Sequence, residues 1–220
     1  MQDKSKTKKK REIKKVRQKT GSYCGPAVME MLVSALGIEL NQESLVDASN
    51  VRGTIMKVGA GLGDLTRGLL RLYPELRVWK KDESSIAALI SLLAKGYFVG
   101  VDWQGVFDRD EYGDDVLEGR WEKYWKKLSG YPDLRGDQGH YIVITEVNIK
   151  KGYVRFADPY GHFAEKDRFI SLWEFEQRWW DDSIIINEKK KRKYIFENRL
   201  MFVITTKTDK VPGDLGMVSS

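Results

Sequence analysis

The sequence predicts one domain of mixed α and β structure, with helices concentrated in its first half and strands in its second. Its 220 residues are enough for a single sizeable domain with its own core. Apolar residues recur at helical spacing along Val28–Leu36 and again along Ile86–Leu93. Two strand-like runs between Gly139 and Ala157, joined by a short turn, indicate a β-hairpin.

The first helix is expected to begin at Cys24, the only cysteine in the chain, and to run to about Leu36. Pro26 suits the first turn, where its missing N–H costs nothing. A helix N-terminus favours a thiolate over a thiol through its unpaired N–H groups and its dipole. The Gln18 amide lies a few residues earlier and can fold back toward the sulfur. Together these residues suggest a nucleophile with one arm of an oxyanion hole. The alternative is a buried structural cysteine.

A series of short elements is expected around this helix and the hairpin. The glycine-rich stretch Val51–Gly63 matches neither nucleotide-binding fingerprint, so we interpret it as a loop. Strands are also expected within 181–187 and over Leu200–Thr206. The other expected elements are a helix capped by Asn41 and ending near Ala48, a helix over Asp64–Leu72, a strand over Leu76–Lys80, a helix capped by Ser84 or Ser85, and a strand over Tyr97–Trp103.

Three segments are expected to be peripheral to the core. The N-terminal residues are mostly Lys and Arg, and we interpret them as a flexible basic arm, with nucleic-acid binding as the alternative. A long polar and aromatic insertion contains a possible helix over Glu118–Leu128, and its acidic start at Asp108–Asp114 is interpreted as a solvated turn rather than a calcium loop. The predicted division is an arm at 1–15, a domain over 16–210 with the insertion at 104–138, and a loose tail at 211–220.

Composition limits the class of protein and its cofactors. The chain is 41% hydrophobic with a net charge of +6, and no apolar run is long enough to span a bilayer. One cysteine cannot form an internal disulfide, and the N-terminus lacks the apolar core of a signal peptide, so we expect a cytoplasmic protein. One cysteine and two histidines without ligand spacing do not form a zinc site, so neither metal nor cofactor is expected.

The hairpin predicts a histidine–carboxylate pair. A turn centred near Ile149 makes the numbers of opposed residues sum to about 298, which places His140 opposite Asp158 on one face of the sheet. An imidazole in this position can take a thiol proton, while the carboxylate fixes its tautomer and stabilises the imidazolium. His162, the only other histidine, follows in a loop and is the second choice for the base.

These motifs resemble those of the papain-like bacteriocin-processing peptidases, also called double-glycine leader peptidases. The similar segments are Gln18 with Cys24-Gly-Pro-Ala, Gly-His140-Tyr-Ile-Val-Ile, Ala-Asp158-Pro, and the helix-like Ile170–Trp179, so that the resemblance covers roughly residues 16–180. It implies a papain-like α+β fold, in which a helical half packs on an antiparallel sheet. It also implies that Cys24 is the nucleophile, His140 the general base and acid, Asp158 the orienting residue and Gln18 the oxyanion donor.

The function expected from this resemblance is that of a stand-alone cysteine peptidase whose substrate is a peptide. Family members typically cut after a Gly-Gly pair at the end of a leader and are often joined to a membrane transporter. The insertion before His140 lies where it can alter the substrate. Two alternatives remain open: amidase or transpeptidase chemistry on the same scaffold, and a peptidase-like module that binds a peptide without cutting it.

Overall fold

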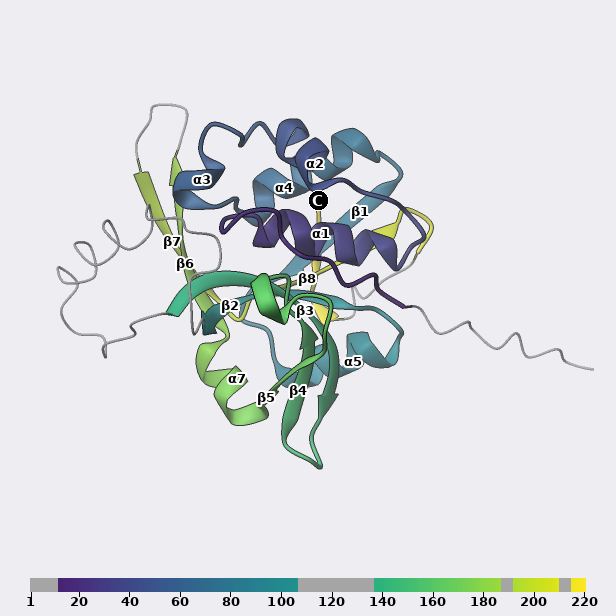
Figure 1. Ribbon diagram of the computed structural model, residues 1–220. Helices are drawn as coiled ribbons and strands as arrows, with labels where there is room; N and C mark the ends of the chain where they lie inside the picture. The colour runs from purple at the N-terminus through teal and green to yellow at the C-terminus, as the bar shows by residue number, and fades with distance from the viewer. Residues whose placement is uncertain (1–11, 107–136, 187–191, 210–214) are drawn as a thin grey trace, which may run out of the picture.

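The computed structural model describes residues 12–106, 137–186, 192–209 and 215–220. A seven-stranded sheet crosses the middle of the molecule in the order β5-β4-β3-β2-β8-β1-β9, and all of its strand pairs are antiparallel (Figure 1). Its strands are β1 (Leu76–Lys81), β2 (Val99–Val106), β3 (Asp137–Asn148), β4 (Tyr153–Ala157), β5 (Arg168–Ser171), β8 (Met201–Thr206) and β9 (Val218–Ser219). A separate hairpin is formed by β6 (Trp180–Ile186) and β7 (Arg192–Asn198).

Helices cover both faces of the sheet. On one face lie α1 (Cys24–Ser34), α2 (Gln42–Ala48) and α4 (Leu62–Leu72), and on the other lie α5 (Ile86–Ala94) and α7 (Leu172–Arg178) (Figure 1). Each face has its own hydrophobic core, which contains Tyr141 and Val143 on the α1 side and Ile142 and Ile144 on the α5 side. The alternation along β3 therefore places this strand between the two cores. The predicted α+β class is confirmed.

The helix starts follow the capping residues expected from the sequence. The Asn41 side chain accepts hydrogen bonds from the N–H groups of Glu43 and Ser44 at the start of α2, and Ser85 accepts one from Ala88 at the start of α5. The interpretation of Val51–Gly63 as a loop was wrong in part, because a short helix, α3 (Ile55–Val58), forms within it.

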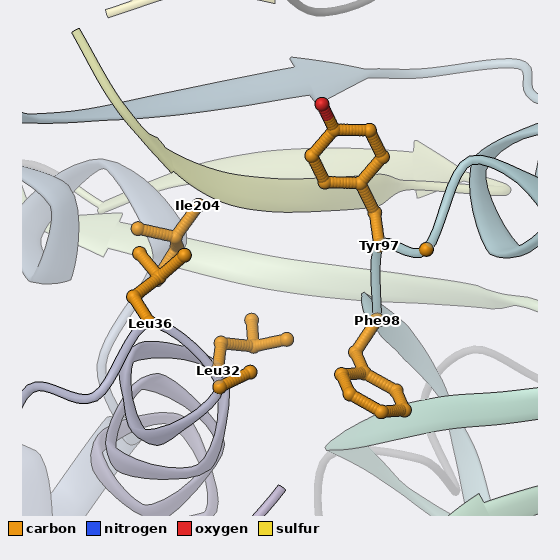
Figure 2. Close-up of a pocket in the computed structure, with 7 residues that line it drawn as sticks. Leu32, Leu36, Tyr97, Phe98 and Ile204 are labelled. Carbon is orange, nitrogen blue, oxygen red and sulfur yellow. The ribbon is translucent and has the colours of Figure 1, made fainter. Parts of the chain in front are cut away.

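The C-terminal end of α1 packs on β8 and on the residues before β2. Figure 2 shows Leu32 and Leu36 near Phe98 and Ile204 around a cavity of about 10 Å³. This volume holds about one water molecule. Since the rise of an α-helix is about 1.5 Å per residue, Leu32 lies about 12 Å along the helix from Cys24. The cavity is therefore remote from the predicted nucleophile.

The register of the β3–β4 hairpin differs from the prediction. Asn148 pairs with Tyr153 and Val147 with Val154, so the turn is centred later than Ile149. A β-bulge at Thr145 then shifts the pairing, and Ile144 lies opposite Phe156. Next to His140 and Asp158, the residue numbers of directly opposed pairs therefore sum to 300, rather than to the predicted value of about 298. His140 and Asp158 still share one face because the difference is two residues, but they are diagonal neighbours rather than directly opposed ones.

The two ends of the chain also differ from the expectation where the structure describes them. Residues 12–15, expected to belong to a flexible arm, lie against the domain: Lys14 N–H donates to Ser34 Oγ, and Lys15 forms an ion pair with Asp167 at 2.8 Å. At the other end, β9 pairs with β1, and Met217 is buried. The tail is therefore an edge strand rather than a loose segment.

Part of the predicted insertion belongs to the sheet. Residues 104–106 continue β2 and residues 137–138 begin β3. The expected acidic turn at Asp108–Asp114 and the expected helix at Glu118–Leu128 lie outside the described residues. Within the described ranges, none of the helices combines the length and apolar character needed to cross a bilayer.

Candidate active site

Cys24 is the first residue of α1 and is half-buried. The residue after it must be small for the helix start to lie where it does. A Cβ atom added to Gly25 would lie 2.6 Å from Leu65 Cδ1 of α4 and 3.3 Å from Tyr141 Cδ2 of β3. Glycine at this position therefore allows the first turn of α1 to contact both elements, which brings Cys24 to the beginning of β3.

The structure brings His140 and Asp158 together, as the sequence predicted. His140 Nε2 lies 2.8 Å from Asp158 Oδ1, and the two residues are 3% and 1% exposed. Cys24 acts on the same imidazole, after Asp158 in strength. Because Nε2 is directed to Asp158, Nδ1 is the ring nitrogen that remains for Cys24. The three side chains thus lie in the order sulfur, imidazole, carboxylate.

Opposing effects determine the protonation of His140. Burial lowers the pKa of the imidazole, while the charge and hydrogen bond of Asp158, followed by those of Cys24, raise it. The negative partners outweigh burial, and the pKa of His140 is raised to about 10. The site is therefore suited to hold an imidazolium between a thiolate and a carboxylate.

Asp158 has two further partners that the sequence analysis did not identify. Its Oδ1 accepts a hydrogen bond from the Tyr160 backbone N–H at 2.9 Å, and its Oδ2 accepts one from Arg168 Nη1 at 2.6 Å. Burial alone raises the pKa of this carboxyl, but His140, Arg168 and the Tyr160 N–H together hold it below its usual value. The carboxylate is therefore ionised although it is buried. Nothing in the local sequence marks Arg168, because its contact depends on how β5 pairs with β4.

The backbone of Gln18 lies beside the Asp158 loop, but its side-chain amide faces the loop before Cys24. The Gln18 backbone N–H donates to the Pro159 carbonyl at 2.9 Å. The side-chain Nε2 donates to the carbonyl oxygens of Thr20 at 2.7 Å and Gly21 at 2.9 Å. Both amide protons are thus directed at loop carbonyls, and the side chain is 1% exposed. The structure places Gln18 at the site in a different orientation from that expected of an oxyanion donor.

His162, the second choice for the base, lies elsewhere. It belongs to the short 3₁₀ helix Gly161–Phe163, and its ring contacts that of Phe163 at a centroid distance of 3.9 Å. The carboxylate of Asp158 is hydrogen-bonded by His140. Geometry therefore favours His140 as the base.

A second buried polar cluster adjoins the site and was not predicted. Asp102 lies directly opposite Tyr141 in the sheet, and its carboxyl interacts with Asp181 of β6. Gln104 Nε2 donates to Asp181 Oδ1 at 2.8 Å. Burial first, and the charge of Glu197 second, raise the pKa of Asp102 to about 7. The sequence around Asp102 does not indicate this cluster, because Asp181 belongs to a hairpin that lies far along the chain.

The described residues contain no group of three His, Cys, Asp or Glu side chains arranged to hold a metal ion. Cys24, His140 and Asp158 supply a thiol, an imidazole and a carboxylate, the set of side chains that covalent acyl transfer uses.

The helices and the antiparallel sheet together form the papain-like fold of C39 peptidase domains. The chain belongs to the Peptidase_C39 like family, whose profile matches residues 10–183. The family predicted from the sequence is thereby confirmed. No curated protein matches the sequence.

The solved structures that are similar to the chain include two peptidase structures. The peptidase domain of Streptococcus ComA, a bi-functional ABC transporter involved in a quorum-sensing pathway, superposes with a TM-score of 0.54 at 14% identity and covers 89% of this chain and 100% of that domain. A Bacillus anthracis protein described as a C39-like peptidase superposes with a TM-score of 0.52 at 15% identity, covering 89% of this chain and 96% of its own. At these identities the likeness establishes the fold.

Proposed function

We propose that the protein is a cysteine peptidase in which Cys24, His140 and Asp158 act as the catalytic triad. The observation that supports this most is the His140 imidazole, which interacts with Cys24 and lies 2.8 Å from a buried, ionised carboxylate. A buried cysteine with only a structural role has no need of an imidazole that is itself held by a carboxylate. The family and the fold point to the same class of enzyme.

The proposed reaction has an acylation and a deacylation half. His140 Nδ1 takes the thiol proton, and the thiolate attacks the carbonyl carbon of a peptide bond. The C–N bond then breaks, the imidazolium gives its proton to the leaving amine, and an acyl-thioester remains on Cys24. Water next gives a proton to His140 and attacks the thioester, which breaks the C–S bond and releases the carboxylic acid product. Asp158 keeps Nε2 protonated throughout, so that Nδ1 faces the sulfur.

Stabilisation of the oxyanion is proposed to come from the start of α1 and from Gln18. The first N–H groups of a helix have no acceptor within the helix, and Cys24 contributes one of them. Gln18 takes part if one amide proton leaves the Thr20 or Gly21 carbonyl when substrate binds. The backbone bond between Gln18 and Pro159 keeps this residue beside the Asp158 loop in either orientation.

The proposed substrate is a peptide, and cleavage after a Gly-Gly pair is the narrower proposal drawn from the resemblance to leader peptidases. The domain is proposed to include residues 12–15 and the edge strand β9 as well as 16–210, and the insertion is proposed to be the segment that joins β2 to β3. No cofactor takes part in the proposed reaction, because the thiolate, the imidazole and water supply every group that is transferred.

The test uses two pairs of variants. Cys24 is the only cysteine, so that any thiol-reactive probe reports on it alone. Wild type should be alkylated rapidly near pH 7 and should create new peptide termini in a proteome digest, while Cys24→Ala should do neither. His140→Gln should lower the rate of hydrolysis by about a thousandfold. His162→Gln is the matched control, since it removes the only other histidine, and it should retain the wild-type rate.

Three results would redirect this proposal. Equal hydrolysis by wild type and Cys24→Ala would refute a thiol peptidase. A peptide that binds but is never cut, with Cys24 inert to alkylation, would indicate the non-catalytic binding module, which the inward orientation of the Gln18 amide favours. Products that carry an added amine acceptor in place of water would indicate a transpeptidase.

A further inference from the structure

We propose that Arg168 is a positioning residue, which holds the Asp158 carboxylate in the orientation that His140 requires. The proposal rests on the peptidase function proposed above and adds a fourth side chain to its machinery. Arg168 is not expected to touch the substrate, because its guanidinium is directed to the side of Asp158 that faces away from His140.

The geometry places Asp158 between two strands. Asp158 follows the end of β4, and His140 reaches it from β3 while Arg168 reaches it from β5. Arg168 lies directly opposite Phe156 in the β4–β5 pairing, and Asp158 is two residues further along β4, so that Arg168 contacts it diagonally. His140 contacts the carboxylate diagonally from the other side. Each oxygen of the carboxylate thus accepts from a different neighbour, Oδ1 from His140 and Oδ2 from Arg168.

Aromatic packing fixes the guanidinium in this position. The Arg168 Cζ atom lies 3.7 Å from the centre of the Phe163 ring, and the rings of Phe156 and Trp103 lie at 5.6 and 5.8 Å. The Arg168 side chain is 19% exposed, and the Asp158 side chain is fully buried. A planar guanidinium packed on an aromatic face has little freedom to move, so the hydrogen bond to Asp158 is directional.

Other charged residues near β4 and β5 form ion pairs of their own. Asp167, the residue before β5, pairs with Lys15 at 2.8 Å and with Arg155 at 3.6 Å, and Arg155 also pairs with Glu146. These pairs neutralise one another away from the site. The charged groups that act on Asp158 are His140 from β3 and Arg168 from β5.

The effect of Arg168 on the reaction follows from these contacts. Without the guanidinium, Oδ2 of a buried carboxylate loses its charged partner, and such an oxygen is costly to bury. The carboxyl can then take up a proton at a higher pH or rotate, and either change weakens the bond that keeps His140 Nε2 protonated. Arg168 thus sets the pH below which the imidazole is no longer held.

The central comparison is Arg168→Met against Arg155→Met. Arg155 is a suitable control because it is also an ion-paired arginine on a neighbouring strand, but its partners lie on the face away from Asp158. In Arg168→Met the acid limb of the Cys24 alkylation rate should move up by about one pH unit. In the same variant kcat should fall about tenfold with KM within twofold of the wild type. Arg155→Met should match the wild type in all three quantities.

Conservative variants separate charge from packing. Arg168→Lys keeps the charge but not the planar stack, so the acid limb should return to the wild-type pH while kcat is only partly restored. Phe163→Leu keeps Arg168 and removes the ring beneath it, and should lower kcat with little movement of the acid limb. If Arg168→Met does not fold, these two variants decide: wild-type kcat in both would overturn the proposal.

A spectroscopic readout separates this inference from the proposed function. The chain has two histidines, so the imidazole nitrogen signals of His140 can be assigned by comparison with His162→Gln. The low-pH change in the His140 signals should move up by about one pH unit in Arg168→Met. A protein that cuts no peptide but shows this movement would refute the peptidase and leave the positioning role intact. Identical profiles for Arg168→Met, Arg155→Met and wild type would refute the positioning role.

Discussion

The buried carboxyl of Asp102 makes a strong prediction about the dependence of stability on pH. Asp102 is 2% exposed and lies opposite Tyr141 in the sheet. Burial disfavours the charged form of a carboxyl group. Burial, then the charge of Glu197, raise the pKa of Asp102 from 3.8 to about 7, although Tyr141, His140 and Asp181 act in the opposite direction.

The sign of the effect follows from the protons bound in each state. Between about pH 4 and pH 7 the folded protein keeps the Asp102 proton while the unfolded chain has released it. The unfolded state then binds fewer protons, so the free energy of unfolding falls as the pH rises through this window. A pKa difference of about three units, at about 1.4 kcal/mol each, makes the loss on the order of 4 kcal/mol by pH 9.

Asp102→Asn should remove this loss. An asparagine is close in shape to a protonated aspartate and does not ionise, so the folded protein has no proton to lose at this position. Urea unfolding at pH 5 and pH 9, followed by tryptophan fluorescence, should give similar free energies for the variant and the wild type at pH 5. At pH 9 the variant should be more stable by about 3 kcal/mol, because about two of the three pH units of the Asp102 shift lie above pH 5.

An exposed carboxylate provides the control. Asp82→Asn removes the same charge from the surface and should leave the pH dependence of the wild type unchanged, within about 0.5 kcal/mol. If Asp102→Asn and wild type lose stability in parallel between pH 5 and pH 9, Asp102 is ionised in the folded protein at neutral pH, and the argument from burial is refuted.

Two further predictions concern the packing of α1 on its neighbours and the bulge in β3. Gly25→Ala should destabilise the protein by about 1–3 kcal/mol, because its Cβ would lie 2.6 Å from Leu65 Cδ1. The same variant should slow the alkylation of Cys24. Gly53→Ala is the control: its Cβ meets no atom within 4 Å, so neither the urea midpoint nor the alkylation rate should change. Deletion of Thr145 should remove the β-bulge but leave Ile144 opposite Phe156, so that His140 and Asp158 keep their shared face and hydrolysis is retained. Thr145→Ala, which keeps the bulge and loses only the bond from Oγ1 to the Arg155 carbonyl, should also retain activity, and a deletion variant that folds by circular dichroism but is inactive would contradict this register.

Much of the fold could be predicted because its signals are local. The caps at Asn41 and Ser85 depend on residues two or three positions away, and the strand Tyr153–Ala157 is bounded by turn residues on both sides. The hairpin of β6 and β7 could be predicted only in part. A strand was expected within 181–187, but its partner over Arg192–Asn198 follows a basic run that resembles a charged loop.

The residues of the candidate site could likewise be predicted only where their signals are local. Cys24 and His140 stand at the start of a helix and of a strand, and such positions can be read from neighbouring residues. Arg168 and Asp102 cannot be found in this way. Arg168 contacts Asp158 across the β4–β5 pairing, and Asp102 interacts with Asp181 of the separate β6–β7 hairpin, so each role depends on a spatial arrangement that no short stretch of sequence specifies.

The pairing of His140 with Asp158 shows how register decides chemistry. Beside the turn, Val147 lies opposite Val154, and this register continued without change would place Asp158 on the face opposite to His140. The extra residue at Thr145 moves the pairing by one, and because side chains alternate between faces, one residue is enough to bring Asp158 to the face of His140. The sequence analysis reached the correct face with a turn placed too early and no bulge, so two errors in register cancelled. The contact at 2.8 Å therefore depends on the pairing of Ile144 with Phe156, which the bulge allows in the full chain and which the deletion of Thr145 should preserve.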